Sequence, residues 1–334
     1  MAEIIVSREF EGMKIQRFIK RLYPSLPISL IYRIIRKGKV RVNRKKVEHN
    51  FVVKEGDSVI LHLPPDMLTL AAGDEGGSDS NYVISKEDII FENEDFIAIN
   101  KPAGLAVHGG EGHKEDVLLG AIKRYLNFNE SQLRFPPTPV HRLDIDTSGV
   151  LIFAKNYDFL RGFNEIQRGQ KIYKEYVALV SGRSDRREFV IELPVIRRDR
   201  PGGLSTEKVG KTIVKPVAVS EKFAAELKAF SLLRVIIRTG RTHQIRSHLM
   251  QKGLPIVGDR LYGDKEVNRW ALKRLNLKRQ FLHSAIMRFS LNGGEYELTA
   301  PMPYDLRDVL LNLDINFTLL LWRRYEGFLQ GYYR

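Results

Sequence analysis

The sequence predicts an α+β fold with two domains, a small N-terminal α/β domain and a larger one with a mixed, largely antiparallel sheet and flanking helices. Three observations support this prediction. Two amphipathic helices and several short strands occupy residues 1–65. Residues 66–85 are mostly small, polar and acidic, as in a flexible linker. Residues 86–312 contain long strands in succession, without the strand–helix alternation typical of a parallel sheet.

The small domain begins with two helices in which apolar residues recur at helical spacing. These residues are Ile15, Phe18, Ile19 and Leu22, then Leu30, Ile31, Ile34 and Ile35. Ser29 is expected to cap the second helix, which should end at Lys37-Gly38. A strand at 40–43, a basic turn at 44–46 and a strand at 59–63 complete the domain.

Positive charge is concentrated in this domain. The whole chain has a net charge of +14, and residues 1–65 contribute +8 with 14 Lys/Arg against 6 Asp/Glu. Such clustering is typical of a surface that binds nucleic acid phosphates, although a solubilising surface is the alternative. The side chains expected to contact RNA are Arg33, Arg36, Lys37, Arg41, Arg44, Lys45 and Lys46.

The composition excludes several classes of protein. The chain has no cysteine, which excludes disulfides, thiolate nucleophiles and cysteine-bound zinc. It has no Gly-rich phosphate loop and no dinucleotide fingerprint. No segment approaches the roughly 18 apolar residues that cross a bilayer, and the N-terminus lacks the apolar core of a signal peptide. We therefore expect a cytoplasmic monomer that needs no cofactor.

The larger domain should begin with a hairpin over 89–100 that turns at Asn93 to Asp95. Further strands are expected at 172–180, 188–193, 212–220, 228–238, 281–290 and 295–299. Helices are expected at 116–126, 157–168, 242–251, 266–276 and 304–312. Residues 313–334 form an aromatic and basic extension, which would either pack as a helix or stack on bases.

The most informative segment is His141-Arg142-Leu143-Asp144-Ile145-Asp146-Thr147-Ser148-Gly149. It places Asp144 just before a Thr-Ser-Gly turn, and the apolar run 150–154 then predicts a fully buried strand. A carboxylate at the mouth of a strand, in so basic a chain, indicates chemistry on a polyanion. A buried aspartate that pairs with an arginine only for stability is the alternative.

A second candidate lies in the predicted strand 172–180. The alternation of side chains along a strand puts Tyr176 on the same face as Ala178 and Val180. The tyrosine is therefore a candidate for the site, and simple core packing is the alternative.

A third candidate segment is 239–248, in which Thr242 is expected to cap a helix. His243 and Arg246 would then be exposed together near the helix start, where they suit phosphate or carboxylate recognition. His243 and His248 are five residues apart, roughly 140° around a helix, so they do not form a metal-binding pair. We therefore expect no catalytic metal.

Taken together, these segments resemble the RluA family of RNA pseudouridine synthases over nearly the whole chain. Segment 29–61 also resembles an S4 domain, through the signature Ile35-Arg36-Lys37-Gly38-Lys39-Val40-Arg41-Val42-Asn43. The S4 segment favours the RluC-like branch of the family, which acts on large-subunit ribosomal RNA. The other motifs follow in the family's order: Lys101-Pro102-x-Gly104-x-x-Val107-His108, His141-Arg142-Leu143-Asp144, Tyr173-Lys174-x-Tyr176-x-Ala178-Leu179-Val180, Gly240-Arg241-Thr242-His243-Gln244-Ile245-Arg246-x-His248, Gly253-x-Pro255-Ile256-Val257-Gly258-Asp259 and Leu282-His283-Ser284.

The resemblance implies an enzyme that isomerises uridine to pseudouridine without a cofactor. Asp144 would be the catalytic carboxylate, acting either as nucleophile or as base. Tyr176 would stack on the flipped uracil and assist removal of the C5 proton. Arg246 would pair with Asp144 and keep it charged, with Arg241 as the weaker candidate for that pairing.

The resemblance also implies how the site would contact RNA. Arg142 would enter the space that the flipped base leaves. His141, Arg241 and His243 are the other expected RNA contacts of the site. A non-catalytic RNA-binding or ribosome-assembly factor that keeps the fold is the main alternative, and a metal-dependent nuclease is a more distant one.

Overall fold

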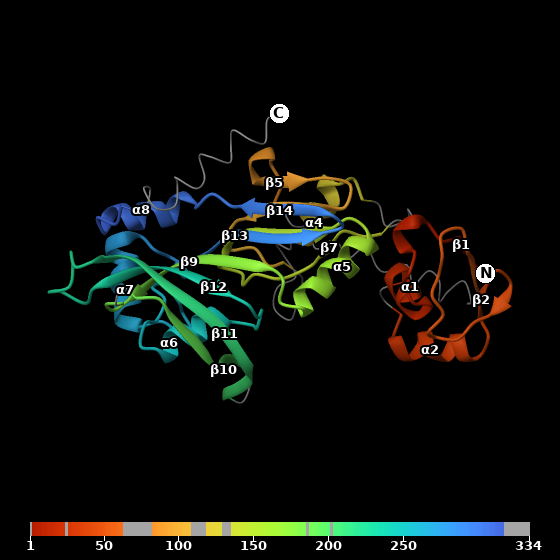
Figure 1. The fold of residues 1–334 in the computed structure, drawn as a ribbon, viewed down its shortest axis with the longest axis horizontal. Coiled ribbons are helices and arrows are strands. Elements are labelled where there is room, and N and C mark those ends of the chain that lie inside the picture. The colour runs from red at the N-terminus through yellow and green to blue at the C-terminus, as the bar shows by residue number, and fades with distance from the viewer. Residues whose placement is uncertain are drawn as a thin grey trace.

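The structure is a computed structural model in which residues 2–23, 26–62, 82–107, 118–128, 135–184, 187–200 and 203–316 are described. The N-terminal domain lies at one end of an elongated molecule, and the large sheet forms the rest (Figure 1). Most of the predicted linker, residue His108 and residues 317–334 of the predicted extension lie outside the described residues.

The N-terminal domain packs two helices, α1 (Ile15–Leu22) and α2 (Ile28–Arg36), on an antiparallel sheet. The strands, in the order β1-β4-β2-β3, are β1 (Ala2–Ile5), β4 (Ser58–Leu61), β2 (Val40–Val42) and β3 (Lys45–Lys46). The predicted helices, strands and helix stop are confirmed, whereas β1 was not predicted.

Two local predictions in this domain are wrong. Ser29 does not cap α2, because the helix already begins at Ile28 and Pro27 is its N-cap. The turn predicted at 44–46 lies one residue earlier, at Asn43-Arg44, where both residues have positive φ. Lys45 and Lys46 consequently belong to a strand.

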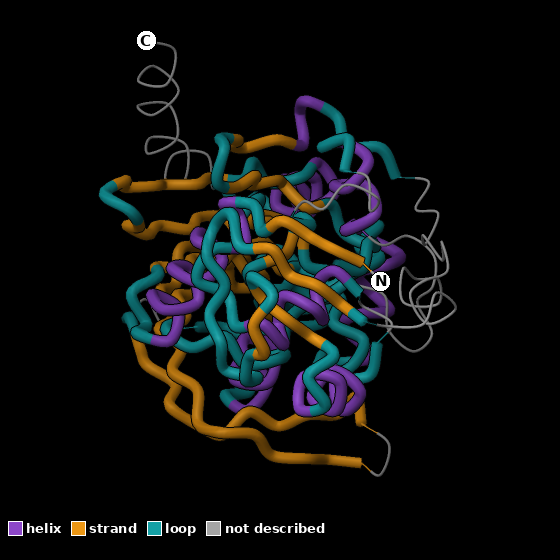
Figure 2. Tube along the Cα trace, turned by 90° about the vertical axis from the view of Figure 1, so that its right-hand side faces the viewer, coloured by secondary structure: helices purple, strands orange, loops and turns teal. Residues whose placement is uncertain are grey.

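The larger domain is built on one ten-stranded sheet. Eight strands follow the order β10-β11-β12-β9-β13-β8-β6-β5, while β14 pairs with β13 and β7 with β8. The strands are β5 (Ile89–Glu92), β6 (Phe96–Lys101), β7 (Thr138–Pro139), β8 (Ser148–Ala154), β9 (Tyr173–Ser181), β10 (Phe189–Arg200), β11 (Gly203–Ser220), β12 (Phe230–Ile237), β13 (Leu282–Leu291) and β14 (Gly294–Thr299). The predicted mixed, largely antiparallel sheet is confirmed, but β10 and β11 are longer than predicted and form a curved hairpin along one edge (Figure 2).

Strands β8 and β13 form the only parallel pair among the described strands, and the pairing joins Ser148 to His283 and Gly149 to Ser284. Gly149 has φ +116°, and a Cβ atom there would overlap the backbone carbonyl of Ser284. The predicted Thr-Ser-Gly turn is wrong, because the turn lies at Ile145-Asp146 and Ser148 and Gly149 already belong to β8. Position 149 needs glycine both for its backbone angle and for this close approach.

Five helices flank the large sheet: α4 (Leu118–Tyr125), α5 (Tyr157–Arg168), α6 (Gln244–Gln251), α7 (Lys265–Leu275) and α8 (Tyr304–Asn312). All five were predicted within a few residues. Thr242 does not cap α6, because the N-cap residue is His243 in a left-handed backbone conformation with φ +58°.

The two domains share a continuous apolar contact. Phe10 packs on Phe135, with ring centroids 6.1 Å apart, and the Arg21 guanidinium lies 4.6 Å from the Phe135 centroid. Arg21 also donates a hydrogen bond to Thr138 Oγ1. The N-terminal domain is therefore attached to the region just before His141.

Candidate active site

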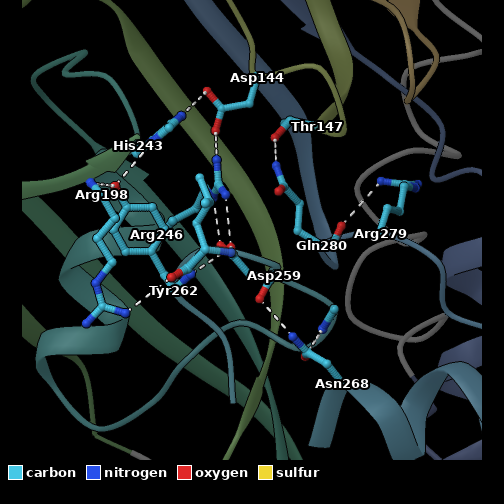
Figure 3. A network of polar contacts seen from close by, with 12 residues as sticks. Asp144, Thr147, Arg198, His243, Arg246, Asp259, Tyr262, Asn268, Arg279 and Gln280 are labelled. Carbon is cyan, nitrogen blue, oxygen red and sulfur yellow. Dashed lines mark hydrogen bonds and ion pairs between the residues drawn. The ribbon is translucent and has the colours of Figure 1, made fainter. Parts of the chain in front are cut away.

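The loop that carries Asp144 is held from beneath by three buried side chains. Lys101 is fully buried at the end of β6, and its Nζ donates to the backbone oxygens of Ile145 at 2.7 Å and Thr147 at 3.1 Å. Arg279 Nη1 donates to the backbone oxygen of Asp146 at 3.0 Å. Gln280 Nε2 donates to Thr147 Oγ1 at 2.8 Å (Figure 3). Four hydrogen bonds from buried side chains thus hold the loop that positions Asp144.

Burial lowers the pKa of Lys101 to about 7, which the fields of nearby Asp146 and Asp144 partly offset. A third hydrogen bond, to the backbone oxygen of Pro102 at 2.8 Å, completes the donor capacity of its ammonium. The sequence contained one signal for this role, a lysine that directly ends a buried strand. Lys101 is otherwise expected only as the first residue of a family motif.

Asp144 is paired with Arg246 of α6. Arg246 Nη1 lies 2.9 Å from Asp144 Oδ2, and the same guanidinium binds Asp259 through Nε–Oδ2 at 2.7 Å and Nη2–Oδ1 at 2.9 Å. Figure 3 shows Arg246 between the two carboxylates. Burial alone would raise the pKa of Asp259, but the hydrogen bonds and charge of Arg246 outweigh it and hold that pKa below its usual range.

This arrangement decides two sequence predictions. Arg246, rather than Arg241, is the partner of Asp144. Arg246 is only 5% exposed, so the expectation of an exposed arginine at the helix start is wrong. The charge of Arg246 is compensated by two carboxylates, and their field raises its pKa against the opposing effect of burial. The sequence indicates no role for Asp259 beyond its place as the last residue of the motif Gly253 to Asp259.

His243 approaches Asp144 from the other side. Its Nε2 is 3.8 Å from Asp144 Oδ1, and its Nδ1 is 3.1 Å from the Tyr262 hydroxyl. Tyr262 is 1% exposed, and the Arg246 guanidinium carbon lies 5.1 Å from its ring centroid. The left-handed backbone at His243 costs conformational energy, and such strain is common where a side chain must be aimed into a site.

Asp144, His243 and Arg246 line a cavity of about 300 Å³. Asp144 and Arg246 lie at its wall, and so does Tyr176, which is 6% exposed on β9. Burial raises the pKa of the Tyr176 hydroxyl to about 12, so the phenol is neutral at pH 7. A carboxylate beside a neutral aromatic side chain in a partly enclosed cavity can act as nucleophile or base.

The remaining predicted site residues divide into two groups. His141, Arg142, Arg241 and His243 all line the cavity, with Arg142 and Arg241 exposed at its rim. Burial lowers the pKa of His141 to about 3, so its ring is neutral at pH 7. The seven basic residues predicted in the N-terminal domain are exposed and lie outside the cavity: Arg33, Arg36, Lys37, Arg41, Arg44, Lys45 and Lys46.

Within the described ranges, no group of three His, Cys, Asp or Glu side chains is arranged to hold a metal ion. None of the described helices combines the length and apolar character needed to cross a membrane.

Comparison with known proteins agrees with this geometry. Residues 95–251 match the RNA pseudouridylate synthase family, and residues 13–59 match the S4 domain. Ribosomal large subunit pseudouridine synthase C of Yersinia pestis is 35% identical over 321 residues, covering 95% of this chain and 97% of that protein. The protein of the same name from Escherichia coli strain K12 is 34% identical over 319 residues, covering 93% and 96%.

A solved structure has the same fold. Human RNA pseudouridylate synthase domain containing 4 matches with a TM-score of 0.52 and 24% identity, over 68% of this chain and 92% of that one. The predicted fold class and the S4 domain are thereby confirmed. With relatives about 35% identical along more than nine-tenths of its length, the chain belongs to the RNA pseudouridylate synthase family and is an RNA pseudouridine synthase.

Proposed function

We propose that this enzyme isomerises specific uridines of large-subunit ribosomal RNA, as a monomer and without a cofactor. The single observation that carries the chemistry is the Asp144–Arg246 pair, 2.9 Å apart at the wall of a cavity of about 300 Å³. The relatives named after the large ribosomal subunit and the basic S4 domain support this choice of RNA.

In this reaction the N1–C1′ bond of uridine breaks, the uracil turns over, and C5 bonds to C1′. Asp144 is the reacting carboxylate, which either attacks C1′ or removes a ribose proton. Arg246 places its positive charge beside Asp144 and orients the carboxylate through the hydrogen bond from Nη1 to Oδ2. Because no electrons are gained or lost overall, the isomerisation needs no redox cofactor.

The uridine must leave its RNA helix to reach this cavity. Arg142 is exposed at the rim and fills the place of the flipped base, because its planar head stacks well between neighbours. Tyr176 lies against the uracil inside the cavity. The exposed basic residues of the N-terminal domain bind the surrounding RNA phosphates.

The test is release of tritium from unmodified large-subunit ribosomal RNA labelled with [5-³H]uridine. Wild-type enzyme should release tritium, while Asp144→Asn should release none and still bind the RNA. Asp158→Asn, on the exposed side of α5, is the control and should behave as wild type. Activity of Asp144→Asn within tenfold of wild type would contradict the role of this carboxylate. Tight binding without release by wild type would instead indicate a binding factor.

A further inference from the structure

Lys174 faces the active-site cavity, and the mechanism above leaves it without a role. It lies on β9 two residues before Tyr176, so both side chains project from the same face of the strand. Both line the cavity, and Lys174 is only 8% exposed. A long cationic side chain is therefore enclosed in the wall of the site.

A buried ammonium is normally paired with a carboxylate, because an uncompensated charge is costly away from water. Lys174 donates one hydrogen bond, from Nζ to the neutral Gln167 Oε1 at 3.1 Å, and forms no ion pair with any described carboxylate. Burial lowers its pKa to about 8, so the amine is still largely protonated at pH 7. Among the described residues, two of its three N–H groups therefore have no hydrogen-bond acceptor, and its charge has no counter-ion.

The strand register fixes where this charge lies relative to Asp144. Because Ser148 pairs in parallel with His283, the loop before Ser148 lies on the Leu282 side of β13. Leu282 pairs with Ala178 of β9, whereas Lys174 pairs with Met287 at the other end. Along β9, the loop that carries Asp144 therefore lies nearest to Ala178, Tyr176 comes next, and Lys174 lies farthest from the loop.

This order has a chemical meaning if the proposed function holds. With C1′ of the ribose at Asp144 and the uracil against Tyr176, the far edge of the base points towards Lys174. The ring atom opposite N1 is C4, so the far oxygen of uridine is O4. After the base turns over and is bonded through C5, the opposite atom is C2, so the far oxygen of pseudouridine is O2. A donor at this place meets a carbonyl oxygen both before and after the isomerisation.

We propose that Lys174 donates a hydrogen bond to this far carbonyl oxygen and stabilises the uracil anion between the two bonded states. When the N1–C1′ bond breaks, its electron pair leaves with the uracil, and the negative charge spreads over N1, O2 and O4. C5 then bonds to C1′, the C5 proton passes to a base in the site, and N1 takes up a proton. Lys174 keeps its own protons throughout.

The same contact would select uridine over cytidine. Cytosine carries an amino group at C4, and an ammonium, which only donates, has no acceptor there. A site that leaves a buried donor unpaired rejects the wrong base strongly. Lys174 would therefore contribute both to the rate and to the choice of base.

The experiment compares Lys174→Met, Lys174→Arg and the wild type in single-turnover reactions on unmodified large-subunit ribosomal RNA. Lys174→Met should lower the rate of pseudouridine formation about 100-fold or more, as for loss of an oxyanion donor, while RNA affinity stays within threefold. Lys174→Arg should restore part of the rate because it keeps the charge. Lys171→Met, an exposed lysine just before the same strand, is the matched control and should match wild type.

A second measurement separates this role from a structural one. At a mapped target, 4-thiouridine replaces O4 by sulfur, a poor acceptor, and product is followed by nucleoside chromatography. The thio substitution should slow wild type at least tenfold and slow Lys174→Met no further. Equal slowing of both enzymes would overturn the proposal.

Two other outcomes also decide it. Weaker RNA affinity with a lower salt slope and an unchanged rate would assign Lys174 to a phosphate and overturn the proposal. A wild type that forms no pseudouridine on this RNA would overturn the proposed function itself. Those two failures are distinguished by the wild-type reaction alone.

Discussion

Asp259 accepts two hydrogen bonds from Arg246, at 2.7 and 2.9 Å, and the third nitrogen of the same guanidinium, Nη1, donates to Asp144. Asp259 is fully buried and also accepts hydrogen bonds from the backbone N–H groups of Leu261 and Tyr262. The carboxylate thus fixes the arginine to the turn after α6, and the arginine in turn fixes Asp144.

We expect Asp259→Ala to lower the free energy of unfolding by about 3–5 kcal/mol, because it leaves a buried guanidinium with a single partner. Urea denaturation followed by circular dichroism measures this loss. Glu92→Gln, which breaks a partly exposed pair with Lys155, is the control and should cost less than about 1 kcal/mol. A cost for Asp259→Ala no larger than that of the control would contradict a structural role for the buried pair.

Lys101 should make stability depend on pH. Its pKa is lowered to about 7 in the folded chain, against an ordinary value of 10.5, so the unfolded chain binds more protons between these values. The free energy of unfolding should therefore rise with pH from about 7 to 10, by at most about 1.4 kcal/mol per pH unit from this group.

Lys101→Met should flatten that rise, whatever its effect on absolute stability. Urea midpoints of wild type and variant at pH 7, 8 and 9 provide the comparison. Parallel curves for the two proteins would show that Lys101 does not titrate in this window.

Two variants of Tyr176 separate the role of its ring from the role of its hydroxyl. With a pKa of about 12, the hydroxyl is neutral at pH 7 and is a poor base, so the ring should carry most of the effect. We expect Tyr176→Phe to reduce tritium release less than tenfold and Tyr176→Ala more than 100-fold. Equal losses in single-turnover assays would show that the hydroxyl is essential.

The N-terminal domain should contribute affinity rather than chemistry. Arg41 and Lys46 are exposed and opposite each other in the β2–β3 pair. The double variant Arg41→Gln/Lys46→Gln should reduce the slope of log K against log salt by roughly 1–2, with the single-turnover rate unchanged. Lys273→Gln on α7, in the other domain, is the control. An unchanged slope in filter binding would exclude these side chains from the RNA interface.

The sequence predicted most of the fold because its signals are local. The apolar run after Ser148 becomes a strand buried on both faces, and α5 has the predicted bounds with Asn156 as its N-cap. The pairing of Asp144 with Arg246 was correctly preferred, although it joins residues 102 positions apart. That preference came from the family resemblance rather than from local pattern.

Long-range contacts explain what the sequence did not predict. Nothing near Asp259 in the sequence indicates that it would meet Arg246, since the contact depends on the turn that follows α6. Thr242 has the chemistry of a cap, but the helix instead begins one residue later, after the left-handed His243. Geometry imposed by the site overrides the local preference at that position.

The parallel junction between β8 and β13 also bears on the order in which the enzyme becomes competent. Asp144 comes just before β8, whereas β13, which fixes the far side of its loop, is among the last strands to be made. A chain still emerging from the ribosome can complete β5 to β8 while Arg246, Gln280 and β13 are not yet synthesised. Such a chain contains Asp144 without Arg246, which pairs with it, and without Gln280, which holds its loop. The site around Asp144 is therefore complete only late in biosynthesis, when nearly the whole domain exists.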